Sequence, residues 1–285
     1  LIFSSGTSCT VPGTLPGDQT ADNTATTSIQ VVPAGSCNLT VSAVASTIAC
    51  NGGTSTLTAT PIGAGGAVEY SIDGTNFQSS NIFTVGAGTY TVTAREVATP
   101  SCSATSSPVV ISQPSAISAS ASAGSAIQCF GGTTTLTVTA SGGTGALEYS
   151  LNGGAFQSGN TFTVSGGTHT VTVRDANGCT VATAPVTVSQ PGQVSVTAVV
   201  TTPIAVPGGT GTITVSASGG TGAKTYVITS GPTINTAGAT SGVFTGLTAG
   251  SYTFTATDEN GCTGSASATL SNPTPGPANA SLNIL

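Results

Sequence analysis

The chain has 285 residues, a net charge of −6, and only three basic residues, and it contains no Met or Trp. A phosphate-binding surface needs clustered Lys and Arg, so this composition argues against nucleic-acid partners and against anionic membranes. No apolar run reaches the roughly 18 residues that a transmembrane helix needs, which argues against membrane insertion. Short runs in which Thr alternates with Val or Leu favour strands over disorder.

Residues 1–37 are expected to form a leader of β character. Its "SCTVP" (8–12) is similar to the "GCTVA" (178–182) that opens a later strand, so the leader is interpreted as the remnant of a truncated module. The uncharged ends of the chain, "LIFSSGTS" and "ANASLNIL", have two interpretations: ordinary or frayed end strands, or donor strands that pair with the sheet edge of a neighbouring subunit. The start at Leu1, without a visible signal peptide, indicates a processed or partial chain that is already exported.

Three tandem copies of one unit follow the leader. The peptides "CNGGTSTLTAT" (50–60), "CFGGTTTLTVT" (129–139) and "VPGGTGTITVS" (206–216) align without gaps. Self-similarity at a nearly fixed period is the signature of a repeat architecture. The predicted repeats and the tail that follows them span 38–114, 115–191, 192–273 and 274–285.

Each repeat is expected to be a small β-sandwich. Gly-rich turns separate its apolar runs, and Asn-Gly between alternating segments is the strongest short-range hairpin signal. Several short strands in about 80 residues are typical of an antiparallel sandwich of the immunoglobulin-like type. The fold class is therefore predicted as all-β, with three tandem immunoglobulin-like sandwiches. In the second repeat the strands are expected near 117–124, 133–141, 146–152, 160–165, 168–175 and 179–189.

The seven cysteines predict disulfides within the repeats. Four up-and-down strands are expected between Cys129 and Cys179, which would place both sulfurs at the same end of the sandwich. The same reasoning pairs Cys50 with Cys102. Closing a loop of about 50 residues should stabilise the fold by roughly 4 kcal/mol, a large contribution for such thin cores.

The remaining cysteines are less constrained. Cys9 and Cys37 both lie in the leader and form a plausible local pair. In the third repeat Val206 occupies the position of the first cysteine, so Cys262 has no partner inside its own repeat. An odd thiol in an exported protein is either free or bonded to another chain, and both alternatives stay open for Cys262.

The recurring pattern C-x-G-G-T, E-Y-S-x-[DN]-G, G-T-Y-T-V-T and D-x-N-G-C-T resembles the SprB-type repeats of bacterial gliding and surface adhesins, over about 38–273. This resemblance implies strings of β-sandwich modules on long exported proteins, and hence an extracellular or bacterial cell-surface location. It supplies no ligand residues. The chain departs from the pattern at Val206 and at "REVATPSC" (95–102), which replaces the D-x-N-G-C turn.

No residue pattern predicts catalysis. His169, the single histidine, occupies the position of a Tyr in the other repeats and is interpreted as a structural strand residue, because a catalytic triad needs a nucleophile and an acid beside it. Glu69 and Glu148 are equivalent residues of separate repeats, so they cannot form the carboxylate pair of one glycosidase cleft. No catalytic, cofactor-binding or metal-binding residue is predicted.

Two other groups of polar residues have competing interpretations. The Asp-Asn pairs Asp175/Asn177 and Asp258/Asn260 offer too few oxygens for a calcium ion, and turn chemistry explains them better. In runs such as "TTTLTVT" the Thr side chains are expected to face solvent and the Leu and Val side chains the core. Binding of ice or sugars by such Thr faces is the alternative.

These features together predict a non-enzymatic structural subunit or stalk segment of an extracellular bacterial surface fibre or adhesin. Copies of the chain, joined head to tail by strand exchange, or neighbouring modules are its expected partners. Two alternatives are a carbohydrate-binding adhesin module, which would bind surface glycans, and an accessory domain of a longer secreted enzyme.

Overall fold

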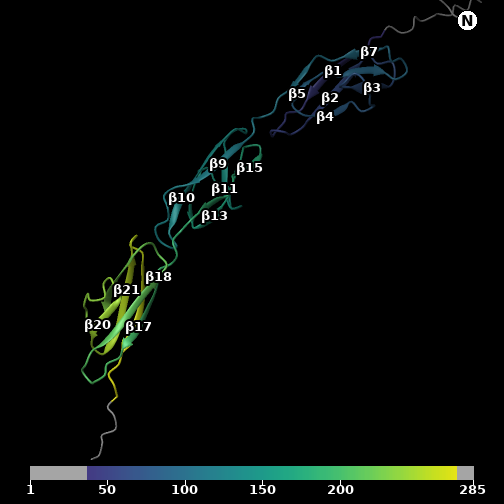
Figure 1. Ribbon diagram of the computed structural model, residues 1–285. Helices are drawn as coiled ribbons and strands as arrows, with labels where there is room; N and C mark the ends of the chain where they lie inside the picture. Colours follow the sequence, from purple (N-terminus) through teal and green to yellow (C-terminus); the bar gives the residue numbers. More distant parts are fainter. Residues whose placement is uncertain (1–36, 275–285) are drawn as a thin grey trace, which may run out of the picture. The chain divides into compact units, whose positions relative to one another are not determined.

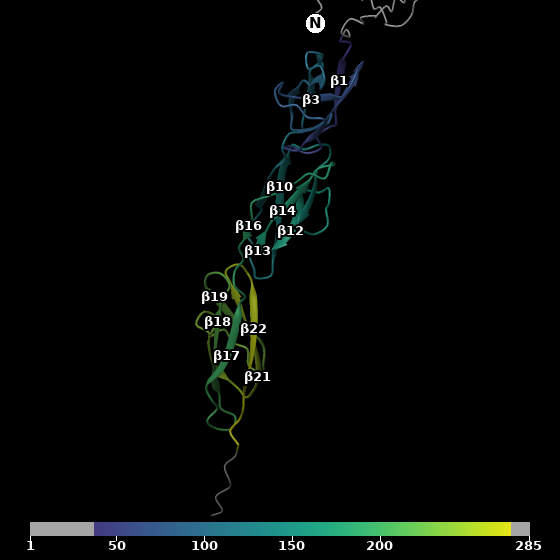
Figure 2. The ribbon, with the colours of Figure 1, turned by 90° about the vertical axis from the view of Figure 1, so that its right-hand side faces the viewer.

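The computed structural model of the chain describes residues 37–274, and each regular element in this range is a β-strand (Figures 1 and 2). These residues form two compact units. Unit 1 holds the first repeat up to Ala45 together with Thr56–Thr84 and Thr89–Val110. Unit 2 holds Ser46–Ser55, Val85–Gly88 and the described chain from Ile111 onward. Residues 1–36 of the predicted leader, Cys9 among them, and residues 275–285 of the predicted tail lie outside the described residues.

The first repeat contributes eight strands, drawn in purple and blue in Figure 1. They form sheets in the orders β1-β2-β4, β3-β6-β7 and β5-β8. The pairings of β1 with β2, of β3 with β6 and of β6 with β7 are antiparallel. The strands are β1 (Thr40–Ala45), β2 (Ser55–Ile62), β3 (Val68–Ser71), β4 (Ile82–Val85), β5 (Gly88–Tyr90), β6 (Thr93–Glu96), β7 (Ser103–Thr105) and β8 (Val109–Ile111).

The second repeat, part of unit 2, reproduces this arrangement. Its sheets have the orders β12-β10-β9, β11-β14-β15 and β13-β16, and all their pairings are antiparallel. The strands are β9 (Ser118–Ala123), β10 (Thr133–Ser141), β11 (Glu148–Leu151), β12 (Thr161–Ser165), β13 (Gly167–His169), β14 (Val171–Arg174), β15 (Thr180–Ala182) and β16 (Val186–Val188).

The third repeat has longer and fewer strands. Its two sheets have the orders β17-β18-β20 and β19-β21-β22, again antiparallel throughout. Every sheet of the described chain therefore takes its strands from a single repeat, and the predicted all-β sandwich class is confirmed. The strands are β17 (Ser195–Thr202), β18 (Gly211–Ser218), β19 (Lys224–Ser230), β20 (Val243–Leu247), β21 (Gly250–Asp258) and β22 (Thr263–Leu270).

Strand alternation builds the cores as predicted. In β10 the Thr side chains at 133, 135, 137 and 139 are exposed, whereas Leu136 and Val138 are fully buried. The third repeat adds aromatic rings: Phe244 and Phe254 are completely buried, with ring centroids 5.1 Å apart. Because aromatic side chains bury far more area than Val or Ala, the third repeat has the largest core side chains.

A proline explains why the last strands of the first two repeats are interrupted. Between β15 and β16 lies Pro185, which has no N–H to donate to a neighbouring strand. Two residues earlier, the hydroxyl of Thr183 accepts a hydrogen bond from the Val171 amide, at 3.1 Å. Ser106 and Pro108 repeat this arrangement in the first repeat. The third repeat has no proline here, and β21 pairs with β22 without a break.

Three disulfides connect six of the seven cysteines, and their partners differ from those predicted. Cys37 is bonded to Cys102. The other two bonds both join successive repeats: Cys50 to Cys179, and Cys129 to Cys262. The predicted pairs Cys50–Cys102, Cys129–Cys179 and Cys9–Cys37 are therefore wrong. Cys262, expected to be free or bonded to another chain, is bonded within its own chain.

The error comes from one uncounted crossing of the sandwich. Between β11 and β12 the chain returns through an isolated antiparallel bridge of Gln157 to Tyr149, too short to be recognised as a strand in the sequence. From Cys129 the chain thus crosses through β10, β11, the Gln157 segment, β12 and the β13–β14 segment. This number is odd, so Cys129 and Cys179 lie at opposite ends of the second repeat.

Candidate functional site: clasps between successive repeats

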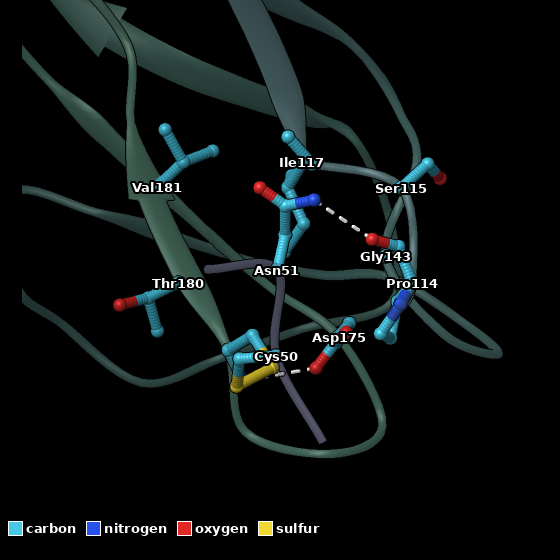
Figure 3. Close-up of a pocket in the computed structure, with 11 residues that line it drawn as sticks. Cys50, Asn51, Pro114, Ser115, Ile117, Gly143, Asp175, Thr180 and Val181 are labelled. Carbon is cyan, nitrogen blue, oxygen red and sulfur yellow. Dashed lines mark hydrogen bonds between the residues drawn. A yellow bond between two sulfur atoms is a disulfide. The ribbon is translucent and has the colours of Figure 1, made fainter. Parts of the chain in front are cut away.

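The first clasp joins the turn Ala49–Gly53 to the D-x-N-G-C turn of the second repeat, and all its residues belong to unit 2. The disulfide Cys50–Cys179 is its covalent part (Figure 3). Beside it, Asn177 Nδ2 donates a hydrogen bond to the Ala49 carbonyl at 3.0 Å. Two neighbouring residues of one turn therefore contact the preceding repeat, one by a covalent bond and one by a hydrogen bond.

The linker between the first and second repeats is fixed by the turn Ala49–Gly53. The amide of Gly52 donates to Gln113 Oε1 at 2.7 Å, and Asn51 Nδ2 donates to the Pro114 carbonyl at 2.9 Å, a bond drawn in Figure 3. The Gln-Pro dipeptide that closes the repeat thus has a structural role: the Gln side chain and the Pro carbonyl accept donors from the clasp turn. The linker is held by side-chain hydrogen bonds in addition to proline stiffness.

Asp175 shapes the turn that carries Asn177 and Cys179. Its side chain is only 3% exposed and accepts the amides of Thr144, Asn177 and Cys179 at 2.9–3.0 Å. Burial raises the pKa of the Asp175 carboxyl, but these backbone donors outweigh burial and leave the pKa below its ordinary value. The Asx-turn interpretation is confirmed, and each carboxylate oxygen already has an N–H donor.

The second clasp repeats this design between the second and third repeats. The disulfide is Cys129–Cys262, and Asn260 Nδ2 donates to the Gln128 carbonyl at 3.1 Å. Asp258 accepts the amides of Thr221, Asn260 and Cys262 at 2.7–3.0 Å. The Thr221 amide is the main cause that lowers the pKa of this carboxyl, followed by the other amides against the opposing effect of burial.

One difference between the two clasps affects the linker. Phe130 stands where the first clasp has Asn51, and its ring is about half exposed. The second linker therefore lacks the amide bond to its proline carbonyl, although the Gly131 amide still donates to Gln190 Oε1 at 3.0 Å.

A glycine seats each linker against the repeat that follows it. At Gly142, with φ 84°, an added Cβ would lie 2.0 Å from the carbonyl oxygen of Ala116. Gly219 makes the same close approach to Gln193, also 2.0 Å, and Gly63 approaches Asn38 in the first repeat. Only glycine combines this backbone angle with the absence of a side chain. The S-G-G-T-G turns are thus linker seats as well as hairpin turns.

The clasp series stops at both ends of the described chain. In the first repeat the loop 95–102 has no Asn, and Cys102 bonds to Cys37, just before β1 of the same repeat. Glu96 replaces the Asp and accepts the Gly65 amide at 2.6 Å. In the third repeat Val206 occupies the cysteine position and is 61% exposed. The two departures from the repeat pattern are therefore the two ends of the disulfide series.

A shallow cavity of about 250 Å³ lies beside the first clasp. Figure 3 shows its lining, with the disulfide and Asp175 on one side and Ile117 and Val181 on the other. Asp175 is fully engaged by amides, and the lining contains no nucleophile with an adjacent base. Within residues 37–274 no group of His, Cys, Asp or Glu side chains is arranged to hold a metal ion.

His169 lies in β13 as a buried strand residue, as predicted. Its Nε2 lies 3.0 Å from the Ser165 carbonyl, and its Nδ1 lies 3.1 Å from Asn152 Nδ2. Tyr252 of the third repeat donates to the carbonyl four residues earlier in the same way, from its hydroxyl to Thr248 at 2.8 Å. His169 therefore replaces a structural tyrosine.

Glu69 and Glu148 lie on separate repeats, as predicted, but neither is a bare surface carboxylate. Glu69 pairs with Arg95 at 2.6 Å, and Glu148 pairs with Arg174 at 2.6 Å. Each guanidinium also lies over a phenylalanine ring, Phe77 or Phe156, at 3.6 and 3.9 Å from the centroid. Sequence analysis missed these pairs, although the register of β3 with β6 and of β11 with β14 sets them directly opposite.

The predicted Thr faces are confirmed in their orientation. All outward-facing residues of β9, β10 and β12 are Ser or Thr, and all are exposed. In the third repeat neighbouring strands join such residues by hydroxyl–hydroxyl contacts, for example Ser251 with Thr269 at 2.9 Å. Nothing among the described residues assigns a ligand to these faces.

The clasp was not predicted, although its signal was present in the sequence. Turn chemistry explains the Asp and Asn of D-x-N-G-C within their own turn and predicts no contact of the Asn side chain outside it. The informative observation is that D-x-N-G-C is lost in the first repeat and C-x-G-G is lost in the third. If the C-x-G-G cysteine of each repeat bonds to the D-x-N-G-C cysteine of the next, the first repeat has no use for D-x-N-G-C and the last has no use for C-x-G-G. Bonds within each repeat do not explain these two losses.

No helix in the described part of the chain could span a membrane. No family model and no curated protein matches the chain. Among solved structures, the N-terminal eight Ig domains of Down Syndrome Cell Adhesion Molecule are 15% identical, with a TM-score of 0.41 over 83% of this chain and 36% of that one. The chain thus spans about a third of that protein fragment.

Two further solved structures show weaker likenesses. A C-terminal fragment of intimin, in complex with the intimin-binding domain of its receptor, is 17% identical, with a TM-score of 0.32 over 56% of this chain and 65% of that one. Fibronectin(III)-like modules of Clostridium thermocellum CbhA are 16% identical, with a TM-score of 0.25 over 53% and 94% of the two chains. Likenesses at this level carry no argument about function.

Proposed function

We propose that this chain is a non-enzymatic, load-bearing segment of an extracellular bacterial surface fibre or adhesin stalk, of the SprB-repeat kind. The observation that supports it most is the clasp, built twice from the same residues at the two junctions between repeats. A structure that binds a small molecule needs one formed pocket, whereas a clasp repeated along the chain serves the connection between modules.

The composition and the disulfides support an exported location. Disulfides form and persist in oxidising compartments such as the cell exterior, and all six cysteines within residues 37–274 are bonded. The sequence has only three Lys and Arg residues, so proteases with basic specificity have few sites to cut. Exposed Ser and Thr side chains cover the sheets without charge.

Contacts between copies, where fibres form, are proposed to be non-covalent. The cross-link through Cys262 considered from the sequence is ruled out, because Cys262 is bonded to Cys129. Head-to-tail strand pairing remains the proposed mode, because the chain has few charged side chains that could prevent a sheet edge from pairing with another strand.

Electron microscopy of intact cells with gold-labelled antibodies against the chain tests the location and the fibre. We expect gold particles along fibres or on the outer surface, and loss of both label and fibres in cells that lack the gene. Label confined to the cell interior would refute the proposal. A glycan array serves as the matched test of the alternative: specific binding to one class of sugars would favour a carbohydrate-binding module.

A further inference from the structure

The three disulfides interleave along the chain. The bond Cys37–Cys102 encloses Cys50, the bond Cys50–Cys179 encloses Cys102 and Cys129, and the bond Cys129–Cys262 encloses Cys179. A chain that is pulled at its ends can extend only along its shortest covalent path, because every residue inside a closed disulfide loop is bypassed. The interleaved order makes that path short.

We propose that this connectivity is a covalent leash, which limits how far the chain can be stretched even when its repeats unfold. From residue 37 the shortest path crosses the bond to Cys102 and follows the backbone to Cys129. It then crosses the bond to Cys262 and follows the backbone to residue 274. At ~3.5 Å per residue this path measures about 150 Å, against about 830 Å for the reduced chain between the same ends.

The leash contains four strands of the folded protein. Its first part contains β7, β8 and β9, and its second part contains β22. Strands rise by ~3.3 Å per residue, close to the limit of an extended chain. These strands are therefore already close to full extension before any force acts, whereas residues 38–101 and 130–261 lie in bypassed loops.

The middle disulfide has a different role from the other two. The path through Cys37–Cys102 and Cys129–Cys262 does not use the bond Cys50–Cys179 at all. If Cys129–Cys262 is absent, the shortest path follows the backbone from residue 37 to Cys50, crosses to Cys179 and continues to residue 274. This longer path measures about 380 Å, so the middle bond is a second, looser leash.

The biological use of the leash rests on the proposed load-bearing function, but its physical content does not. A stalk that met a large force would lose its folded repeats yet keep its length within a narrow limit, and the repeats could refold when the force fell. Reduction of the bonds would release the leash. Failure of the stalk proposal in the cellular experiment above would leave the stretched length unchanged.

Single-molecule stretching of the full chain tests the inference. Handles are attached to both termini through peptide tags, in a Cys9→Ser background, and the fully stretched contour length is compared between samples. We expect addition of a reductant to lengthen the wild-type path by about 680 Å. The Cys129→Ser/Cys262→Ser variant should be about 230 Å longer than the oxidised wild type.

The matched control is the Cys50→Ser/Cys179→Ser variant, which loses one disulfide as well but should keep the stretched length of the oxidised wild type. An increase in this control by more than ~50 Å, about 14 residues of extended chain, would overturn the inference. So would an oxidised wild type that stretches as far as the reduced protein. The reductant arm needs no substitution of a bonded cysteine, so it remains decisive if a disulfide variant fails to fold.

Discussion

The turn at Cys129 and the turn at Val206 are built alike, but only the first is bonded to another repeat. In both, the amide of the second glycine donates to the carbonyl of the first residue, Gly132 to Cys129 at 3.0 Å and Gly209 to Val206 at 2.9 Å. In both, a buried isoleucine precedes the turn, Ile127 or Ile204. The glycines and the isoleucine therefore set the turn, and the sulfur adds a connection to a turn that forms without it.

The same division holds on the partner side. Asp175 and Asp258 fix the D-x-N-G-C backbone through amide donors within their own repeats, and the Asn and Cys side chains then reach the preceding repeat. The residues that fix the turn therefore differ from the residues that join it to the preceding repeat. Substitutions can change the connection without changing the turn.

The largest effect is expected from removing the second clasp. The Cys129→Ser/Cys262→Ser variant opens a loop with a sequence separation of 133, and the chain-entropy model assigns a loss of about 5 kcal/mol to it. Chemical unfolding followed by circular dichroism should show a lower midpoint. An unchanged midpoint would mean that the bond contributes no stability and would remove the distinction between the two turns.

The second largest effect is expected at Gly142, the glycine that lies against the linker between the first and second repeats. Gly142→Ala places a Cβ 2.0 Å from the Ala116 carbonyl oxygen at φ 84°, so we expect a loss of about 2 kcal/mol or more in the free energy of unfolding. The control is Gly153→Ala, where φ is 77° but nothing lies within 4 Å of the added Cβ. It should lose only about 1 kcal/mol. Equal losses would show that the close approach to the linker is unimportant.

Acid should weaken the turns that carry the clasps. The folded pKa values of Asp175 and Asp258 lie below the ordinary value, so their stabilisation is present above the unfolded pKa of about 3.9 and is lost as the pH falls through the folded pKa. Unfolding midpoints measured from pH 6 to pH 2 should fall below about pH 4. The Asp175→Asn/Asp258→Asn variant should show a flatter acid limb, and a slope identical to the wild type would contradict the assignment.

A smaller effect is expected from the asparagines. Asn177→Ala and Asn260→Ala each remove one side-chain hydrogen bond to a carbonyl of the preceding repeat, worth about 0.5–1 kcal/mol. Hydrogen exchange should increase in the turns around Ala49 and Gln128, respectively, and the disulfides should still form. Asn177→Asp, which keeps the size but replaces the donor with a carboxylate facing the Ala49 carbonyl, should lose at least as much stability as Asn177→Ala if the hydrogen bond is the cause.

The smallest effect belongs to Val206. Because this side chain is mostly exposed, Val206→Ser should change stability by less than about 0.5 kcal/mol. Val206→Cys should add one titratable thiol per chain under denaturing, non-reducing conditions, because within residues 37–274 all cysteines are already bonded. No increase in thiol count would show that the described pairing is incomplete.

The fold was predictable because it depends on local patterns. Alternating Thr and Leu or Val gave β10 its correct bounds, 133–141, and the Gly-rich turns separated the strands correctly. The interruptions at Pro108 and Pro185 could have been foreseen from the missing N–H. Between β11 and β12, however, a return strand that consists of one bridge at Gln157 leaves no periodic signal.

That single bridge explains why the predicted disulfide pairs were wrong. Disulfide pairing depends on which end of a sandwich each sulfur reaches, and one crossing more or less exchanges the ends. The pairing therefore could not be derived from strand counting, whereas the positions of five of the bonded cysteines had been recognised. The cation–π contacts of Arg95 and Arg174 also escaped, because they depend on strand register.

Non-reducing tryptic mapping of the denatured, alkylated protein tests the disulfide connectivity most directly. Cleavage after Arg95, Arg174 and Lys224 divides the chain into four peptides. The bonds Cys37–Cys102, Cys50–Cys179 and Cys129–Cys262 predict that all four stay joined as one species until a reductant is added. Release of peptide 225–285 without reduction would contradict the clasp between the second and third repeats.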